Sequence, residues 1–225
     1  KLPEGLSYTV AEEGGRAKLT CKGKNAPSHS PQKGVSAIEG MLAILAACPQ
    51  APAGLVQAAG ELLALLGGAP DGKAMGIACA DDVSGALTTN LGMIRLDEKG
   101  LWVKMDVRAP VTFSLDEIAA KVKAAFAAKG YQAEGEHLKH PLYVPADSAF
   151  IQTLCRVYET VTGEDAVLSA IGGGTYARAF PNCVCFGSVY PTEELTVHSP
   201  NERTRKANII QNTVMYGFAL HELTN

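Results

Sequence analysis

Residues 87 to 130, "LTTNLGMIRLDEKGLWVKMDVRAPVTFSLDEIAAKVKAAFAAKG", contain the signals that decide the fold. Two apolar stretches flank the turn-forming residues "DEKG" (97–100) and predict a β-hairpin. A helix is expected next, because Ser114 and Glu117 have the spacing of a capping box and Gly130 follows as a stop signal. The stretch therefore predicts two antiparallel strands followed by a helix that packs on one of their faces.

The residues before this stretch predict a similar order of elements. The segments "LSYTV" (6–10) and "RAKLTCK" (16–22) predict a first hairpin, and helices are expected at about 35–48 and 54–66. A further strand is expected at 131–137. Antiparallel pairs with helices on one face indicate an α+β fold, an α/β sandwich of the ferredoxin-like kind.

The sequence changes character near His140, where we place a domain boundary between residues 1–139 and residues 140–225. The second part predicts a capped helix at 147–163, a glycine-rich loop at 172–178, a buried strand at 183–189 and a helix over the last 20 residues. Cys183 and Cys185 alternate along that strand, so both are expected to be buried thiols.

Composition excludes several classes of partner. The chain has 225 residues, and a formal net charge of −3 gives no electrostatic reason to expect a nucleic acid or an anionic membrane. The 6 cysteines contain no C-x-x-C pair, which fits the reducing cytosol better than a secreted scaffold. We expect a cytoplasmic protein, because neither a signal peptide nor an apolar segment of membrane-spanning length is found in the sequence.

His198 is the first candidate for metal or catalytic chemistry, because it lies between the expected strand at 183–189 and the last helix. The other four histidines show none of the H-E-x-x-H, H-x-D or H-x-H spacings of metal sites. The pair Glu12–Glu13 is expected in a solvated hairpin turn, and Glu193–Glu194 is expected as exposed charge in a loop. On local residues alone, a metal site around His198 is not complete.

Two further groups could bind a ligand. The loop "IGGGTYAR" (171–178) would let backbone amides approach a ligand and offers Arg178 to a carboxylate, although a simple tight turn is the alternative. Alternation along 103–108 places Val103, Met105 and Val107 on one face and Lys104, Asp106 and Arg108 on the other. An ordinary solvated face is the alternative for these charged residues.

Several longer segments resemble the PepV-type dipeptidases, members of the superfamily of binuclear zinc aminopeptidases, carboxypeptidases, carnosinases and aminoacylases. The C-terminal segments are "HPLYVPADSAF" (140–150), "VTGED" (161–165), "IGGGTYARAFPN" (171–182) and "HSPNE" (198–202). Upstream, "KGKNAPSHSPQKGVSA" (22–37) and "TTNLGMIRLDEKGLWVKMDVRAP" (88–110) are similar to the lid domain of that family. The resemblance covers nearly the whole chain.

The resemblance implies a zinc-dependent metallopeptidase that hydrolyses dipeptides by metal-activated water. It implies a lid at 1–139, followed by the C-terminal part of a catalytic domain. The family's N-terminal half, which carries the H-x-D, the bridging Asp and the Glu–Glu pair, has no counterpart here. The chain, which opens on Lys1, is therefore expected to be a fragment that is inactive alone, with the N-terminal catalytic segment as its partner.

The resemblance also implies roles for individual residues. His198 would be a zinc ligand, with two zinc ions in a complete site and manganese as an alternative metal. Arg108 would clamp the terminal carboxylate of the dipeptide. The remaining substrate-binding residues would be Gly173, Gly174, Thr175 and Arg178.

One departure from the family concerns the lid histidine that assists the oxyanion. Its position aligns without gaps to Pro27, and His29 lies two residues later, so His29 is the candidate catalytic residue only if the loop shifts locally. A second function class also stays open, a non-catalytic binding or dimerisation module with a homodimer as its assembly.

Overall fold

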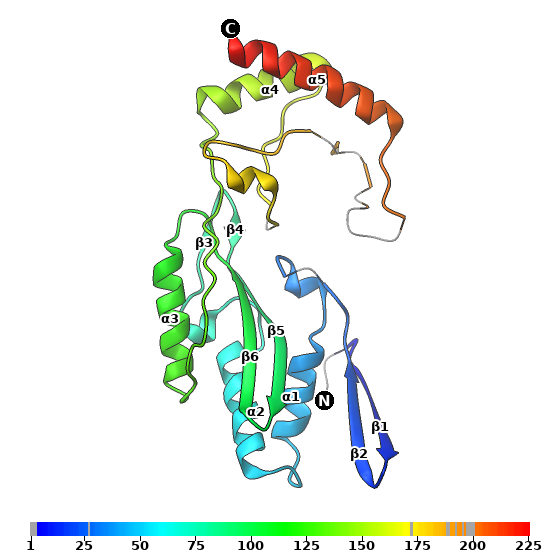
Figure 1. Cartoon of the computed structure of the whole chain (residues 1–225), viewed down its shortest axis with the longest axis vertical. Coiled ribbons are helices and arrows are strands. Elements are labelled where there is room, and N and C mark those ends of the chain that lie inside the picture. The colour runs from blue at the N-terminus through cyan, green and yellow to red at the C-terminus, as the bar shows by residue number, and fades with distance from the viewer. Residues whose placement is uncertain are drawn as a thin grey trace. The chain divides into compact units, whose positions relative to one another are not determined.

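The computed structural model describes residues 4–26, 28–171, 173–187, 190–191, 193–194, 196 and 201–225. The chain divides into two compact units, Lys1–His140 and Pro141–Asn225. The described residues form helices and small antiparallel sheets (Figure 1).

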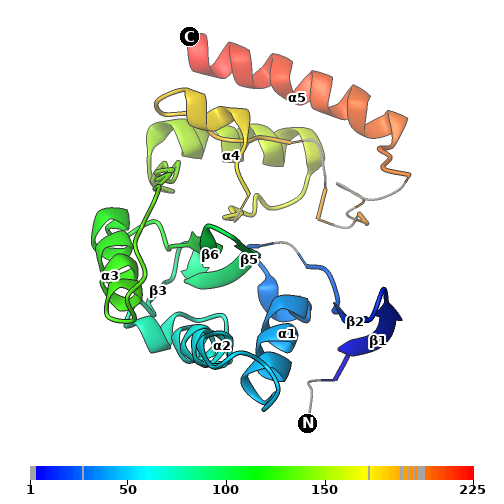
Figure 2. The same ribbon diagram turned by 60° about the horizontal axis from the view of Figure 1, so that its bottom comes forward.

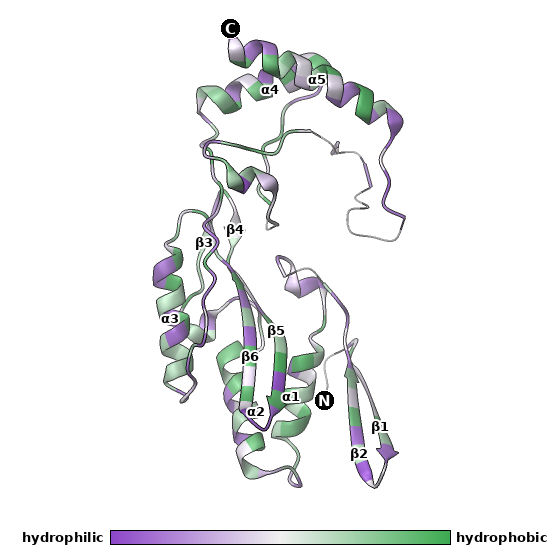
Figure 3. Ribbon diagram, in the orientation of Figure 1, coloured by the Kyte–Doolittle hydropathy of each residue, from purple (hydrophilic) through white to green (hydrophobic). Residues whose placement is uncertain are grey.

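The β5–β6 ribbon organises the first unit. Strand β5 (Thr88–Asp97) pairs antiparallel with β6 (Gly100–Arg108), as the sequence predicts, and the register shifts between Leu91 and Met93. Hydrophobic and hydrophilic residues alternate along β6 (Figure 3). The face that carries Val103, Met105 and Val107 packs into the core, so the opposite face carries the polar side chains.

Helices α1 (Ala37–Ala46), α2 (Ala53–Leu66) and α3 (Leu115–Ala127) lie on the apolar side of this ribbon (Figure 2). Two clusters of buried residues make the core. They contain Leu42, Ala59, Leu62, Leu66 and Leu91 in one, and Leu65, Met75, Ile77, Leu87 and Ile118 in the other. Met105 and Phe126 pack against both clusters, so the ribbon and the helices share one continuous core.

Helix α3 begins and ends where local signals predict. The Ser114 hydroxyl accepts the backbone N–H of Glu117 at 3.3 Å and caps the first turn. Gly130 follows the helix with φ +83°, a left-handed conformation that glycine adopts without strain. Both ends of α3 are therefore set by residues next to them in the sequence.

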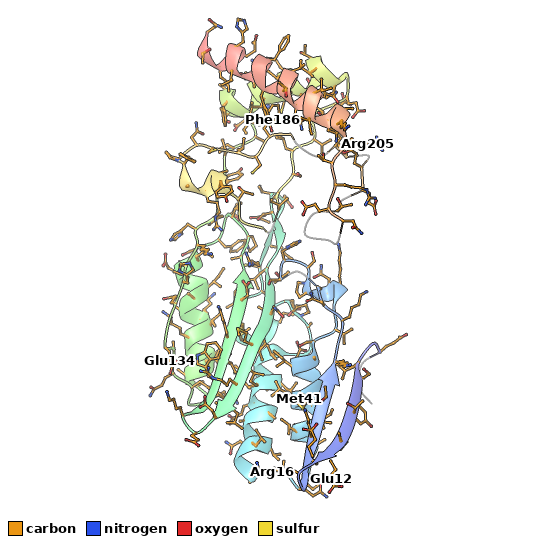
Figure 4. All side chains as sticks on the ribbon, turned by 45° about the vertical axis from the view of Figure 1, so that its right-hand side comes forward. Glu12, Arg16, Met41, Glu134, Phe186 and Arg205 are labelled. Carbon is orange, nitrogen blue, oxygen red and sulfur yellow. The ribbon has the colours of Figure 1, made fainter. Side chains whose placement is uncertain are left out.

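Strands β1 (Ser7–Glu13) and β2 (Arg16–Lys22) form a separate hairpin. Glu12 and Arg16 lie at its tip (Figure 4). The expectation that Glu12 and Glu13 occupy the turn is wrong, because both pair within the ladder and the turn residues are Gly14 and Gly15. The hairpin meets α1 at Gly40, where a Cβ would lie 3.1 Å from the Sγ of Cys21.

Short elements connect these parts of the first unit. They are η1 (Pro31–Lys33), η2 (Lys73–Met75), β3 (Ala80–Asp81) and β4 (Gly85–Ala86). The strand expected at 131–137 is absent from this described segment. The segment instead returns along α3, because the Tyr131 ring packs edge-on against Phe126 at 5.9 Å and Glu136 pairs with Lys123.

The second unit is built on α4 (Ala149–Thr162) and α5 (Lys206–Thr224), and both helices confirm the sequence prediction. Leu154, Val157, Met215 and Ala219 form its buried cluster. The short helix η3 (Tyr176–Ala179) follows the glycine-rich loop. Among the helices of the described residues, none combines the length and the apolar character that crossing a membrane requires.

The buried strand expected at 183–189 is not found over 183–187, the part of it that the structure describes. Val184 and Phe186 pack against the α4–α5 cluster, so this segment is held by side chains without a strand partner among the described residues. Cys183 is only half-buried and Cys185 is exposed, so the expectation of two buried thiols is wrong.

Candidate functional site

Arg108 ends β6 on the polar face of the β5–β6 ribbon. Its Nη2 lies 2.8 Å from the Oδ2 of Asp106, and the two side chains are 39% and 36% exposed. Because Thr88 is paired with Arg108 and Asn90 with Asp106, these four side chains share the face opposite the core. A half-exposed ion pair adds little stability, but it restricts the orientation of the guanidinium.

The loop that carries His29 reaches the same end of the ribbon. The Thr88 hydroxyl donates to the carbonyl of Ser28 at 3.4 Å, and Thr88 is the cross-strand partner of Arg108. Two backbone hydrogen bonds between Lys24 and Val35 close the base of this loop at 3.0 and 2.9 Å. The structure thus brings the His29 loop to Arg108, with His29 exposed. Pro27 lies outside the described residues.

A hydrogen-bonded cluster around Asp81 fixes the chain that follows Arg108. The Asp81 carboxylate accepts from Ser84 and from both the backbone N–H and the hydroxyl of Thr112, and the Ser84 hydroxyl accepts from the N–H of Val111. Desolvation acts to raise the pKa of Asp81, but the hydrogen bonds from Ser84 and Thr112 outweigh it and hold the pKa well below its usual range. The carboxylate therefore stays ionised and anchors residues 110–112.

The glycine-rich loop of the second unit brings Gly174 and Arg178 together. A Cβ on Gly174 would lie 3.0 Å from Nη1 of Arg178, so a larger residue there would displace this guanidinium by a few tenths of an ångström. Gly173, Gly174 and Thr175 are exposed, and the Thr175 hydroxyl lies 3.1 Å from the Sγ of Cys185. These residues can meet a ligand from solvent.

His198 lies outside the described residues, so its predicted role as a ligand has no structural description. On either side of it, the Thr196 hydroxyl accepts the N–H of Arg203 and donates to the Arg203 carbonyl, both at 3.1 Å. Glu193 is only 14% exposed and pairs with Arg205 at 3.2 Å, near the start of α5 (Figure 4). The expectation that Glu193 is merely exposed charge is therefore wrong, whereas Glu194 is largely exposed and pairs with Arg203.

The predicted site residues fall into two groups. His29 and Arg108 belong to the first unit, and Gly173, Gly174, Thr175 and Arg178 belong to the second. Within the part of the chain that the structure describes, no three His, Cys, Asp or Glu side chains form a group that could hold a metal ion. Asn90, which the sequence analysis did not single out, joins the face of Arg108 through the strand register.

Comparison with known proteins finds relatives but no matching family model. The chain is 33% identical over 153 residues to the Staphylococcus saprophyticus protein named "Putative dipeptidase SSP1012", covering 68% of this chain and 33% of that protein. It is 34% identical over 154 residues to "Putative dipeptidase YtjP" of Bacillus subtilis, covering 68% and 32%. A Staphylococcus epidermidis protein named "Putative dipeptidase" is 31% identical over 153 residues, covering 68% and 33%.

The chain therefore spans about a third of the length of the curated relatives that it matches. All three of these relatives carry the name of a dipeptidase.

Proposed function

We propose that this chain is part of a PepV-type metallodipeptidase in which Arg108 clamps the carboxylate of the dipeptide. The observation that carries the proposal is the arginine that ends β6, paired with Asp106 at 2.8 Å beside the His29 loop, in a chain similar to proteins named as dipeptidases. A guanidinium can bond both oxygens of a carboxylate at once, which suits recognition of a free peptide terminus.

In this proposal, residues 1–139 are a ferredoxin-like lid and residues 140–225 belong to the catalytic domain. His29 would stabilise the oxyanion, because its loop is tied to the Arg108 end of the ribbon through Ser28 and Thr88. Gly173, Gly174, Thr175 and Arg178 would contact the substrate from the second unit. Holding a dipeptide by its carboxylate fixes the scissile bond relative to the catalytic groups.

Zinc, with manganese as an alternative, is the proposed cofactor, and His198 is its proposed ligand in this chain. Bound zinc ions polarise a scissile carbonyl and lower the pKa of a bound water. The proposal assigns the other ligands and the general base to the rest of a longer protein, in line with relatives of which this chain spans about a third. What this chain contributes is recognition and orientation of the substrate.

Arg108→Ala, made in the longer protein that contains this chain, tests the clamp. The loss of charge-assisted hydrogen bonds is expected to lower kcat/KM on free dipeptides by about 10- to 200-fold, corresponding to about 1.5–3 kcal/mol. Arg108→Lys is expected to restore little, because an ammonium lacks the planar fork. Activity on dipeptide amides is expected to stay nearly constant.

Arg95 supplies the matched control for this experiment. It lies on the same ribbon and pairs with Asp97 at 3.2 Å, as Arg108 pairs with Asp106. Arg95→Ala is expected to leave kcat/KM on both substrates near the wild-type value. Equal losses on free and amidated dipeptides with Arg108→Ala would show that Arg108 only supports the fold.

A non-catalytic dimerisation module is the second candidate function. It is favoured by the β1–β2 hairpin, where Tyr8 and Val10 are 56% and 65% exposed. Their cross-strand partners are Cys21 and Leu19, so these four apolar side chains share one face of the hairpin. Sedimentation of this chain distinguishes the candidates, because a dimer that Val10→Glu dissociates would support the module.

A further inference from the structure

A small cavity lies in the first unit between α3 and the segment that leads into β3, which run beside each other (Figure 1). Its volume is about 110 Å³. This is room for several water molecules, or for one solute of about six to eight non-hydrogen atoms. The buried side chains of Ile77 and Ile118 form its apolar part. Among the described residues that line the cavity, none belongs to the proposed dipeptide site.

The helical wall of this cavity carries one charge of each sign. Glu117 and Lys121 both line the cavity, and their spacing of four residues places them on the same face of α3. A Glu four residues before a Lys is the favourable order for an ion pair on a helix. Neither side chain, however, forms a salt bridge or a hydrogen bond with the part of the chain that the structure describes. Both charges can therefore meet a ligand in the cavity.

The thiol of Cys79 also lines the cavity but adds no charge to it. Desolvation by burial, and then the nearby Asp81, raises the pKa of this thiol, whereas Lys121 acts to lower it. The thiol therefore stays protonated at neutral pH. Among the described residues that line the cavity, Glu117 and Lys121 are thus the charged ones.

An anion and a cation on one wall, about 5–6 Å apart at their Cβ atoms, are complementary to a small zwitterion. We propose that this cavity binds a small free α-amino acid, with Lys121 bound to its carboxylate and Glu117 bound to its ammonium. Glycine and alanine fit the volume of the cavity, and the alanine methyl group would contact Ile77 and Ile118. The link to activity rests on the proposed function, because dipeptide hydrolysis releases free amino acids, whereas the binding itself does not rest on it.

The experiment titrates the 225-residue chain with alanine and follows the backbone amides by NMR. Two charge-assisted interactions predict a dissociation constant on the order of 1 mM, with shift changes at Ile77, Cys79 and Ser114. N-acetylalanine lacks the ammonium and alaninamide lacks the carboxylate, so each is expected to bind about 10-fold more weakly. Phenylalanine is expected not to bind, because its ring exceeds the volume of the cavity.

Two variants match these two analogues. Lys121→Met removes the charge and keeps an unbranched side chain, so it is expected to weaken alanine binding about 10-fold and to leave the weak binding of alaninamide unchanged. Glu117→Gln is expected to weaken alanine binding similarly and to leave N-acetylalanine unchanged. Lys129→Met is the matched control, because it removes the same charge from an exposed position about 12 Å further along the helix axis. The fluorescence of Trp102 during urea unfolding shows whether each variant is folded.

The outcomes separate this site from the proposed dipeptide clamp. Losses that follow the charge missing from each analogue and each variant support the amino-acid site. Equal alanine binding by the wild type and Lys121→Met overturns it, as does the lack of saturation at about 50 mM alanine. Shift changes confined to the surroundings of Arg108 also overturn it, because the amino acid would then bind at the clamp. Arg108→Ala is expected to leave alanine binding unchanged, so either proposal can fail while the other stands.

Discussion

At the scale of single residues, the two stacked tyrosines of the second unit differ in their hydrogen bonds. The rings of Tyr158 and Tyr190 lie 6.4 Å apart, and the Tyr190 hydroxyl donates to Oδ1 of Asn212 at 2.9 Å. The buried hydroxyl of Tyr158 has no partner among the described atoms. Desolvation, then the neighbouring Tyr158, Glu193 and Tyr216, raises the pKa of Tyr190, so its phenol stays a donor at neutral pH.

Removing the Tyr158 hydroxyl and removing the Tyr190 hydroxyl are therefore expected to change the stability of the second unit in opposite directions. Tyr158→Phe keeps the ring and removes an unsatisfied polar atom, so the free energy of opening α4 and α5 is expected to stay constant or rise by up to about 1 kcal/mol. Tyr190→Phe leaves the side-chain carbonyl of Asn212 without its donor. The free energy of opening α4 and α5 is therefore expected to fall by about 0.5–1.5 kcal/mol. Hydrogen exchange of the helix amides measures both. A larger loss for Tyr158→Phe would mean that its hydroxyl has a partner.

At the scale of elements, Asp81 joins the β3–β4 turn to residues 110–112, and its Oδ2 accepts from Thr112, which is 31 residues away in sequence. Asp81→Asn is expected to destabilise the first unit at neutral pH, because the charged acceptor is lost. The native pKa is lowered, so the stabilisation is complete above the unfolded pKa of about 3.9 and is lost as pH falls below it toward the native pKa. The difference between wild type and variant should therefore shrink only below about pH 4.

Urea unfolding followed by Trp102 fluorescence measures this difference, since the chain has 1 Trp and it lies in β6. Asp82→Asn is the control. This neighbouring carboxylate is exposed and makes no hydrogen bond or ion pair within the described residues, so its removal should change stability by less than about 0.5 kcal/mol. A wild-type advantage over Asp81→Asn that is constant down to pH 3 would contradict the linkage.

Local signals in the sequence predicted the elements whose determinants are local. The caps at Ser114 and Ser148 lie within three residues of the N–H groups that they accept, so the starts of α3 and α4 could be predicted. The prediction of a strand at 131–137 was wrong, because a strand needs a hydrogen-bonded partner strand and this segment packs against α3 instead. The apolar residues at 183–189 led to the prediction of a buried strand. Over the part that the structure describes, these side chains pack against α4 and α5 and not within a sheet.

The same distinction applies to the candidate site. Alternation along β6 is local, and it placed Arg108 and Asp106 on one face in advance of the structure. The position of Asn90 depends on the register between two strands, and the closeness of the His29 loop depends on the Ser28–Thr88 hydrogen bond across 60 residues. Neither can be derived from spacing along the chain.

At the scale of the whole molecule, the two units differ in how completely they bury their apolar residues. Every residue of the two core clusters of the first unit lies between 38 and 131. In the second unit, hydrophobic and hydrophilic residues both occur along α5 (Figure 3). The helix buries the stripe of Asn208, Met215 and Ala219, and apolar side chains elsewhere on it, among them Ile209, Ile210 and Leu220, are exposed.

Residues 1–140, expressed alone, are therefore expected to fold cooperatively, with Trp102 fluorescence and exchange-protected amides in α1, α2 and β5 matching those of the whole chain. Residues 141–225, expressed alone, are expected to show weak protection and to bind a hydrophobic dye, because their small cluster leaves most of α5 in water. Ile210→Glu should reduce the dye binding of the second piece, since this position is 68% exposed and lies away from the buried stripe of Asn208, Met215 and Ala219. Met215→Glu is the matched variant, because Met215 is fully buried and the same charge there should abolish the remaining protection. Strong protection confined to residues after His140, with rapid exchange throughout residues 1–140, would contradict autonomous folding of the first unit.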